Sequence, residues 1–214
     1  LIGVALFIHK RSNEQRYVPL QVENRKLSQR TKTAAVMITM LIPLTLFVSV
    51  VYVGVQNYYI ISLVVLLECM LPFALMFEKR KPQARELVVI AALCAICVAG
   101  RAVFFMLPQF KPVMALTILA GVALGGEVGF LVGAMSMLLS NVLFSQGPWT
   151  PWQMFAMGIV GFLAGVLYQK GWLRRAKSSL CIFGVICTVL IYGGLMNPVS
   201  ALIWGNGALN RNML

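Results

Sequence analysis

Long apolar runs constrain this chain more than any other feature of its sequence. They cover residues 33–55, 58–77, 87–107, 112–124, 128–144, 152–168 and 180–204. The last run contains Gly193, Gly194 and Pro198, which predict an interrupted helix. A helix needs about 20 apolar residues to cross a bilayer. Hydrophobic residues make up 60% of the chain and charged residues 11%, whereas soluble domains have roughly 45–50% and 25%. The composition excludes a water-soluble enzyme and predicts an all-α polytopic membrane protein.

The basic residues are unevenly distributed along the chain. The formal charge is +12, from 18 Lys and Arg against 6 Asp and Glu, and most of the basic residues fall in the segments 9–32, 79–85 and 170–177. If the runs alternate across the membrane, these segments lie on one side, and an excess of Lys and Arg marks cytoplasmic loops. We therefore expect a cell-membrane protein with cytoplasmic basic loops and no nucleic-acid partner. This orientation depends on the short run at 112–124 crossing the membrane.

The composition changes near Lys79, which divides the chain into two parts. The runs before it are rich in Leu, Val and Ile, whereas the later ones contain many small residues. Glycines recur there every fourth position, at Gly121, Gly125, Gly129, Gly133, and again at Gly161 and Gly165. Small residues at this spacing let helix backbones approach closely in lipid. We expect an accessory transmembrane helix pair at 33–78 and a tightly packed core at 85–204.

The remaining segments complete the expected organisation. The chain lacks an initiator Met and begins with a short apolar stretch. We therefore expect the end of a truncated transmembrane helix at 1–8, followed by a basic cytoplasmic loop at 9–32. Residues 205–214 are expected to start a truncated C-terminal segment.

The sequence contains no recognisable catalytic arrangement. His9 is the only histidine and lies among loop charges. No glycine-rich loop ends in Gly-Lys-Ser/Thr, the signature of a phosphate-binding loop. Cys94 and Cys97 lie on one helical face, but no His or Cys cluster accompanies them, so we expect reduced packing residues. We expect no enzyme, no metal site and no cofactor.

Glu68 and Arg101 are ionisable residues inside apolar runs. A charge at membrane depth is costly and marks a functional site or a buried pair. Glu68 is interpreted as a structural residue, either protonated or paired. Arg101 either extends to the outer interface or binds a ligand. Their depths differ by roughly 6 Å along the helices. We predict that the accessory pair packs against the core and that these side chains form a structural charge pair.

The most distinctive segment is Gln146-Gly147-Pro148-Trp149-Thr150-Pro151-Trp152-Gln153, between two runs on the outer side. Its tryptophans fit an interfacial aromatic belt as well as a pocket where aromatic rings lie beside amide groups. A turn at 108–111 and a helix break at Asn197-Pro198 are expected on the same side, and irregular backbone at membrane depth lines cavities. The candidate substrate-binding residues are Arg101, Gln109, Lys111, Asn141, Gln146, Trp149, Trp152, Gln153 and Asn197.

Alanines form a stripe in the run 87–107. Ala91, Ala95 and Ala99 recur at every fourth position, so they lie on one helix face. On spacing alone, the stripe fits packing against a neighbouring core helix as well as docking on a partner protein. It is a candidate coupling interface.

Several motifs of the core resemble one family of membrane proteins. They are Ala91-Ala92-Leu93-Cys94-Ala95 leading to Gly100-Arg101, Gly125-Gly126-Glu127-Val128-Gly129, the proline-tryptophan segment continued by Met154, and Gly161-Phe162-Leu163-Ala164-Gly165. With these motifs, residues 85–204 resemble the substrate-binding S component of energy-coupling factor (ECF) vitamin transporters. The proline-tryptophan segment is the specific motif, whereas the alanine spacing is weak by itself.

The resemblance implies a helical bundle of six core helices with both ends cytoplasmic. Such a protein binds a micronutrient from outside and docks on a transmembrane coupling subunit with two ATPases, which favours docking for the alanine stripe. Five of the six core helices are present, so we expect the sixth to be missing. The accessory helices favour the cobalamin-type branch, with cobalamin or another corrinoid as substrate. The alternatives are another micronutrient, or an ion-coupled secondary transporter of a small polar solute.

Overall fold

The computed structural model describes residues 29–48, 57–77, 84–107, 112–174 and 176–209. All regular elements in these ranges are helices, which confirms the predicted all-α class. The first continuous helix consists of α2 (Gln29–Val36), the π-helical turn η1 (Met37–Leu41) and α3 (Ile42–Val48). It is followed by α4 (Tyr58–Phe77), α5 (Ala84–Val103), α6 (Val113–Leu124), α7 (Gly126–Phe144), α8 (Thr150–Gln169), α9 (Lys177–Ile186), the π-helical segment η4 (Cys187–Gly193) and α10 (Gly194–Leu209).

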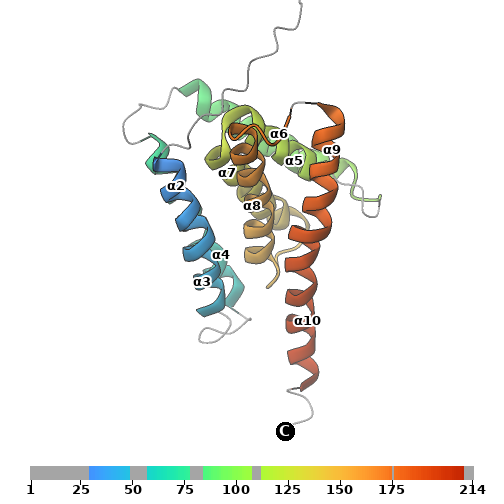
Figure 1. The fold of residues 1–214 in the computed structure, drawn as a ribbon. Helices are drawn as coiled ribbons and strands as arrows, with labels where there is room; N and C mark the ends of the chain where they lie inside the picture. Colours follow the sequence, from blue (N-terminus) through green and yellow to red (C-terminus); the bar gives the residue numbers. More distant parts are fainter. Residues whose placement is uncertain (1–28, 49–56, 78–83, 108–111, 175, 210–214) are drawn as a thin grey trace, which may run out of the picture.

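The described helices match the predicted apolar runs. Thr31–Val48, Gly126–Phe144, Thr150–Gln169 and Lys177–Ala201 are each long and apolar enough to cross a membrane. Shorter apolar helices occupy Ile60–Leu71, Leu87–Val103 and Val113–Leu124. The last of these is the run on which the predicted orientation depends, and it forms a single helix, α6, between α5 and α7 (Figure 1).

The predicted interruption of the last run is wrong. The helix continues from Lys177 to Ala201 without a break, with Pro198 inside α10. A proline cannot donate a hydrogen bond to the carbonyl four residues earlier, which here belongs to Gly194. The π-helical segment η4 ends at Gly193, directly before that residue. The wider turn of η4 therefore accommodates the proline within a continuous helix.

Helices α6, α7 and α8 meet backbone to backbone at their glycines. A Cβ atom added at Gly129 of α7 would lie 2.6 Å from the Gly161 carbonyl oxygen of α8 and 2.6 Å from the Gly121 Cα of α6. A Cβ at Gly133 would lie 2.6 Å from the carbonyl oxygen of Met157. Side chains cannot occupy these positions, so the close approach predicted from the glycine spacing is confirmed.

One glycine also forms the turn between α6 and α7. Gly125 has a φ of 105° and donates its N–H to the Gly121 carbonyl oxygen at 3.0 Å, and α7 begins at the next residue. This positive φ is unfavourable for residues that carry a Cβ atom. The glycine therefore permits the sharp reversal that places α6 and α7 side by side.

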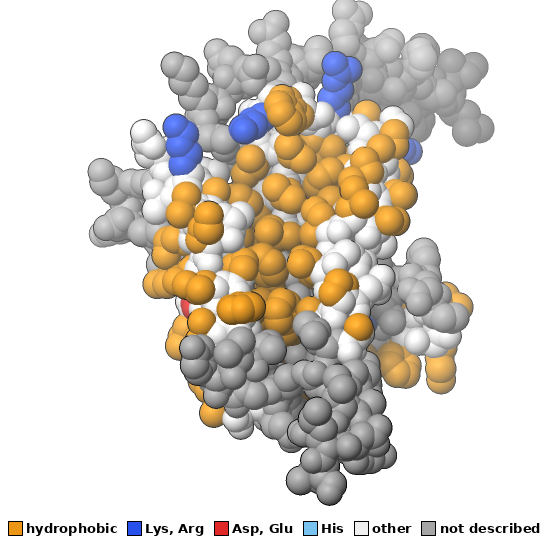
Figure 2. Space-filling model, turned by 60° about the horizontal axis from the view of Figure 1, so that its bottom comes forward, with side chains coloured by type: hydrophobic (Ala, Val, Ile, Leu, Met, Phe, Trp, Pro, Cys, Tyr) orange, Lys and Arg blue, Asp and Glu red, His pale blue; other side chains and the backbone are white. Residues whose placement is uncertain are grey.

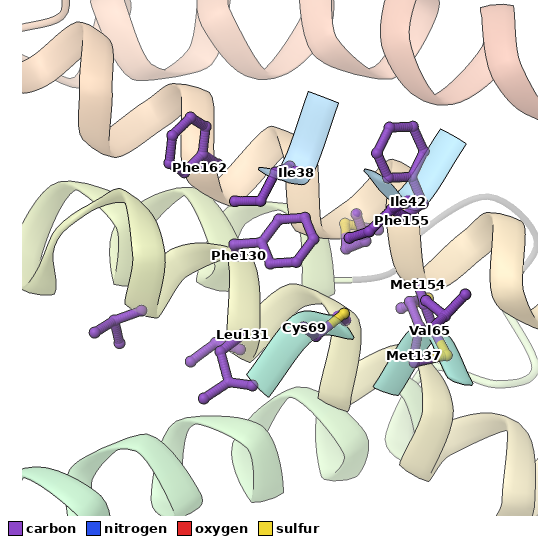
Figure 3. Packing of buried hydrophobic residues seen from close by; sticks show 14 of the residues in the cluster. Ile38, Ile42, Val65, Cys69, Phe130, Leu131, Met137, Met154, Phe155 and Phe162 are labelled. Atoms are coloured by element: carbon purple, nitrogen blue, oxygen red, sulfur yellow. The ribbon is translucent and has the colours of Figure 1, made fainter. Parts of the chain in front are cut away.

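The first helices share one hydrophobic core with the later ones. Figure 3 shows Phe130 of α7 between Ile38 of the first helix and Cys69 of α4, with Ile42 of the first helix beside Phe155 of α8. All five side chains are buried. The expectation that the accessory pair packs against the core is confirmed, and this pair contributes directly to the interior.

The surface of the described helices is largely apolar. Figure 2 shows hydrophobic side chains across one face, with Lys and Arg gathered along its upper border. Long apolar side chains such as Val88 and Ile96 of α5, Ile182 of α9 and Val189 of η4 are exposed. A lipid environment would cover these side chains, consistent with a membrane protein.

The glycine contacts generate the first testable prediction. Gly129→Ala should lower the free energy of unfolding by about 1–3 kcal/mol, because the added methyl group forces the backbones of α6, α7 and α8 apart. The melting temperature of the purified protein, followed with a thiol-reactive dye that reports exposure of buried cysteines, measures this loss.

The matched control is Gly194→Ala. A Cβ at this position has no heavy atom within 4 Å, and alanine is the better helix former by about 1 kcal/mol. The control should melt at the same temperature as the parent protein or higher. Equal destabilisation by both substitutions would contradict the proposed role of the glycine contacts.

Candidate functional site

A cluster of polar side chains lies inside the helical bundle around Asn141. We call Arg101, Ser140, Asn141, Thr150, Gln153 and Tyr192 the Asn141 cluster. Its members come from α5, α7, α8 and η4. Ser140, Asn141 and Thr150 each have 0% of their surface exposed. A buried polar group requires hydrogen-bond partners, and the cluster supplies them from within itself.

Arg101 turns one end of its guanidinium toward this buried interior. Its Nη1 donates to the Ser140 hydroxyl at 2.6 Å and to the Asn141 Oδ1 at 2.8 Å, and the sulfur of Met137 lies 3.9 Å away. Arg101 is therefore held by α7 instead of extending away from the bundle, as a snorkelling side chain would.

Asn141 connects α7 to the start of α8. Its Nδ2 donates to the Thr150 hydroxyl at 3.1 Å and to the Gln153 Oε1 at 2.8 Å. Both amide hydrogens and the amide oxygen are thus used. The Thr150 hydroxyl also accepts the N–H of Gly147 at 3.3 Å, which ties the preceding loop to the cluster.

The local sequence explains why these groups meet. α7 ends at Phe144, so Ser140 and Asn141 occupy its last turns. The loop returns the chain within a few residues, and Pro151 stands in the first turn of α8, where its missing N–H is not needed. Thr150 and Gln153 therefore begin α8 directly beside the end of α7.

Tyr192 joins the cluster from the π-helical segment η4. Its hydroxyl interacts with the Gln153 side chain and lies within electrostatic range of Arg101. π-helical turns often occur at functional sites because they redirect a side chain. Here η4 places a polar aromatic residue against α8.

The two tryptophans of the connecting segment pack against protein. A Cβ at Gly147 would lie 2.5 Å from ring atoms of Trp149, so that indole folds back over its own loop. Trp152 is half-buried and packs against the main hydrophobic core. Beside them, the Gln146 Oε1 is buried and has no hydrogen-bond partner among the described residues.

The predicted Glu68–Arg101 charge pair is not formed. The Thr45 hydroxyl donates to the Glu68 Oε1 at 2.5 Å, across the two accessory helices, while Arg101 bonds to α7. The other carboxylate oxygen of Glu68 is buried without a hydrogen-bond partner in the described part of the chain. The prediction failed because the depth of a residue along its helix does not specify toward which neighbouring helix its side chain points.

The other candidate residues have different outcomes. Asn197 is exposed on α10, outside the cluster, and the helix break expected beside it is absent. Gln109 and Lys111 lie outside the described residues. Sequence reasoning missed further members of the cluster, namely Ser140, Thr150 and Tyr192. Ser140 could have been found as the polar neighbour of Asn141 in an apolar run, whereas a π-helical segment has no comparable sequence signal.

The alanine stripe and the cysteine pair lie on opposite sides of α5. Ala91, Ala95 and Ala99 are all exposed. Cys94 and Cys97 are buried and unpaired, and the Cys94 sulfur lies 4.0 Å from the Val132 carbonyl oxygen of α7. Within the described ranges, no group of three or more His, Cys, Asp or Glu residues could hold a metal ion.

The arrangement of the Asn141 cluster is suited to binding. It combines one cationic side chain with hydroxyl and amide groups at the ends of packed helices, as small-molecule sites do. Nucleophilic catalysis would require a nucleophile within reach of a general base. The cluster residues themselves do not contain that combination.

Comparisons with known proteins relate the part of the chain that carries the Asn141 cluster to one family. Residues 81–204 match the family model described as ECF-type riboflavin transporter, S component. The UPF0397 protein of Vibrio atlanticus (strain LGP32) is 29% identical over 120 residues, which are 53% of this chain and 65% of the relative. The UPF0397 proteins of Aliivibrio fischeri (strain MJ11) and Aliivibrio salmonicida (strain LFI1238) are each 35% identical over 88 residues, 39% of this chain and 48% of the relative.

The chain therefore spans about half to two thirds of the length of these curated relatives. No solved structure matches it significantly.

The hydrogen-bond geometry predicts that Asn141 is the most sensitive residue of the cluster. Asn141→Ala removes the shared partner of Arg101, Thr150 and Gln153, and an unsatisfied buried polar group costs about 1–3 kcal/mol, more if it is charged. We expect a clearly lowered melting temperature in the thiol-dye assay. Asn197→Ala, the same substitution at an exposed position, should leave it unchanged. Equal stability of the two variants would show that the cluster contributes no net stability.

Proposed function

The chain belongs to the ECF-type riboflavin transporter S component family, and from this membership we propose that it is the membrane-embedded substrate-binding subunit of an ATP-driven ECF importer. It captures a vitamin from outside the cell. The observation that carries this proposal is the Asn141 cluster, in which helices from both ends of the matched region bring binding groups together inside an apolar bundle.

The proposed orientation places this cluster on the outer side of a cell membrane. The basic segments 9–32, 79–85 and 170–177 would be cytoplasmic by the positive-inside rule. Exposed Lys32 and Lys177, at the starts of the first and last long helices, belong to the end opposite the cluster. A substrate would reach Arg101 and Asn141 from outside.

The proposed substrate is a vitamin, with riboflavin as the first compound to test because the family model bears that name. A corrinoid such as cobalamin is the second, since tryptophans and amides fit a large amide-rimmed ligand. Asn141 and Gln153 bond to each other, so a corrinoid would have to use the Gln146 amide.

The proposed partners are a transmembrane coupling subunit and two ATPases. Support comes from the alanine stripe, whose members Ala91, Ala95 and Ala99 are exposed on α5. Small side chains let a partner helix approach closely in lipid. ATP hydrolysis would occur in the partners.

Isothermal titration of the purified protein tests the binding function. Riboflavin, cobalamin and cobinamide should be compared, and one of them should bind with a dissociation constant of about 1 μM or below, equivalent to roughly −8 kcal/mol. Loss of that affinity in a Trp149→Ala, Trp152→Ala double variant would support a site at this end of the bundle. Unchanged affinity in the double variant would show that the vitamin binds elsewhere in the protein.

A substitution in the alanine stripe tests coupling. Ala95→Trp should abolish vitamin uptake by cells that express the complete transporter, while the purified variant binds its vitamin normally, because the indole prevents close docking. Ala115→Trp is the matched control, since Ala115 is an exposed alanine on α6. Loss of binding together with uptake in Ala95→Trp would contradict a coupling role, and so would equal loss of uptake in the control.

A further inference from the structure

Arg101 carries a positive charge at membrane depth that no carboxylate among the described residues balances. Glu68 is bonded to Thr45 of the accessory helices. Glu86 precedes Arg101 by 15 residues on α5, and Glu127 belongs to the first turn of α7, at the opposite end of that helix from Asn141. The separation along the helix is about 20 Å. Intramembrane charges are costly and are normally paired, or they mark a substrate pathway.

The described residues hold the Arg101 guanidinium at one end. Its hydrogen bonds to the described residues all come from Nη1. The groups that receive them, Ser140 and Asn141, are neutral and fully buried. A guanidinium has five N–H donors in a planar fork, so most of its donors make no hydrogen bond to the part of the chain that the structure describes.

The surrounding cluster fixes this side chain in place. Asn141 is held by Thr150 and Gln153 of α8, and Gln153 in turn interacts with Tyr192 of η4. The orientation of Arg101 is thus set before any ligand arrives. A preorganised arginine, with donors that the described residues leave unused, matches the planar geometry of a carboxylate or the oxygens of a phosphate.

We infer that Arg101 is the residue that selects substrates carrying an anionic group, a carboxylate or a phosphate. This inference rests on the proposed function and adds a substrate class to it. The ligand supplies the negative charge that the described part of the protein does not, and the neutral members of the Asn141 cluster hold the arginine for it. A neutral analogue of the same ligand would leave the guanidinium uncompensated.

Matched ligand pairs test the inference. Purified protein in phosphatidylcholine nanodiscs is titrated with riboflavin and its 5′-phosphate, with pantothenol and pantothenate, and with biotin amide and biotin. In at least one pair, the anionic compound should bind about 10–100-fold more tightly than the neutral one, as expected for charge-assisted hydrogen bonds. Equal affinities within every pair that binds would overturn the inference and leave the proposed function intact.

Variants of Arg101 assign the selectivity to this side chain. Arg101→Gln should remove the preference for the anionic compound, whereas Arg101→Lys, which keeps the charge without the fork, should retain part of it. Lys170→Gln is the control, because Lys170 lies at the other end of α8, over the Trp172 ring. A preference that survives Arg101→Gln would overturn the inference.

Two further results complete the test. The thiol-dye melting assay shows whether each variant is folded. If Arg101→Gln does not fold, the ligand preference of Arg101→Lys alone decides whether Arg101 selects the anionic compound. If adding phosphatidylglycerol to the nanodiscs abolishes the preference in the parent protein, Arg101 binds a lipid headgroup and the inference is overturned. If none of the compounds binds, the proposed function fails and the inference fails with it.

Discussion

The backbone contact of α6, α7 and α8 is the constraint on which the rest of the structure depends. Lipid chains are as apolar as leucine, so helices in a membrane associate through close packing more than through the hydrophobic effect. Glycines at Gly121, Gly129 and Gly161 let the backbones touch where any side chain would collide. That contact sets α7 and α8 antiparallel at short distance, and the end of one then lies beside the start of the other.

The polar cluster is a consequence of this packing. With α7 and α8 in contact, Asn141 reaches Thr150 and Gln153 across the loop that joins the two helices. Each of these groups would be costly alone in an apolar interior. Together they satisfy one another and hold Arg101, which enters from α5. The proposed binding site and the packing of α7 against α8 therefore depend on the same hydrogen bonds.

The accessory helices are part of the same structural unit. They precede residue 81, where the family match begins, yet Ile38, Ile42 and Cys69 are buried against α7 and α8 (Figure 3). Glu68 and Thr45 bond to each other between these helices. The accessory pair therefore joins its own two helices through the Thr45–Glu68 bond and contacts the bundle through apolar side chains. This explains how the pair packs on α7 and α8 without disturbing the Asn141 cluster.

The sequence by itself determined the helical class, the limits of most helices and the close approach of the glycine-rich ones, because each follows from a local pattern of apolar or small residues. It also identified Arg101, Asn141 and Gln153 as polar residues in an apolar chain. Only the tertiary structure decided their partners. The Glu68–Arg101 pair failed because depth along a helix leaves its rotation open, and Tyr192 was missed because a π-helical segment changes that rotation. Which polar groups meet depends on how whole helices are turned against one another.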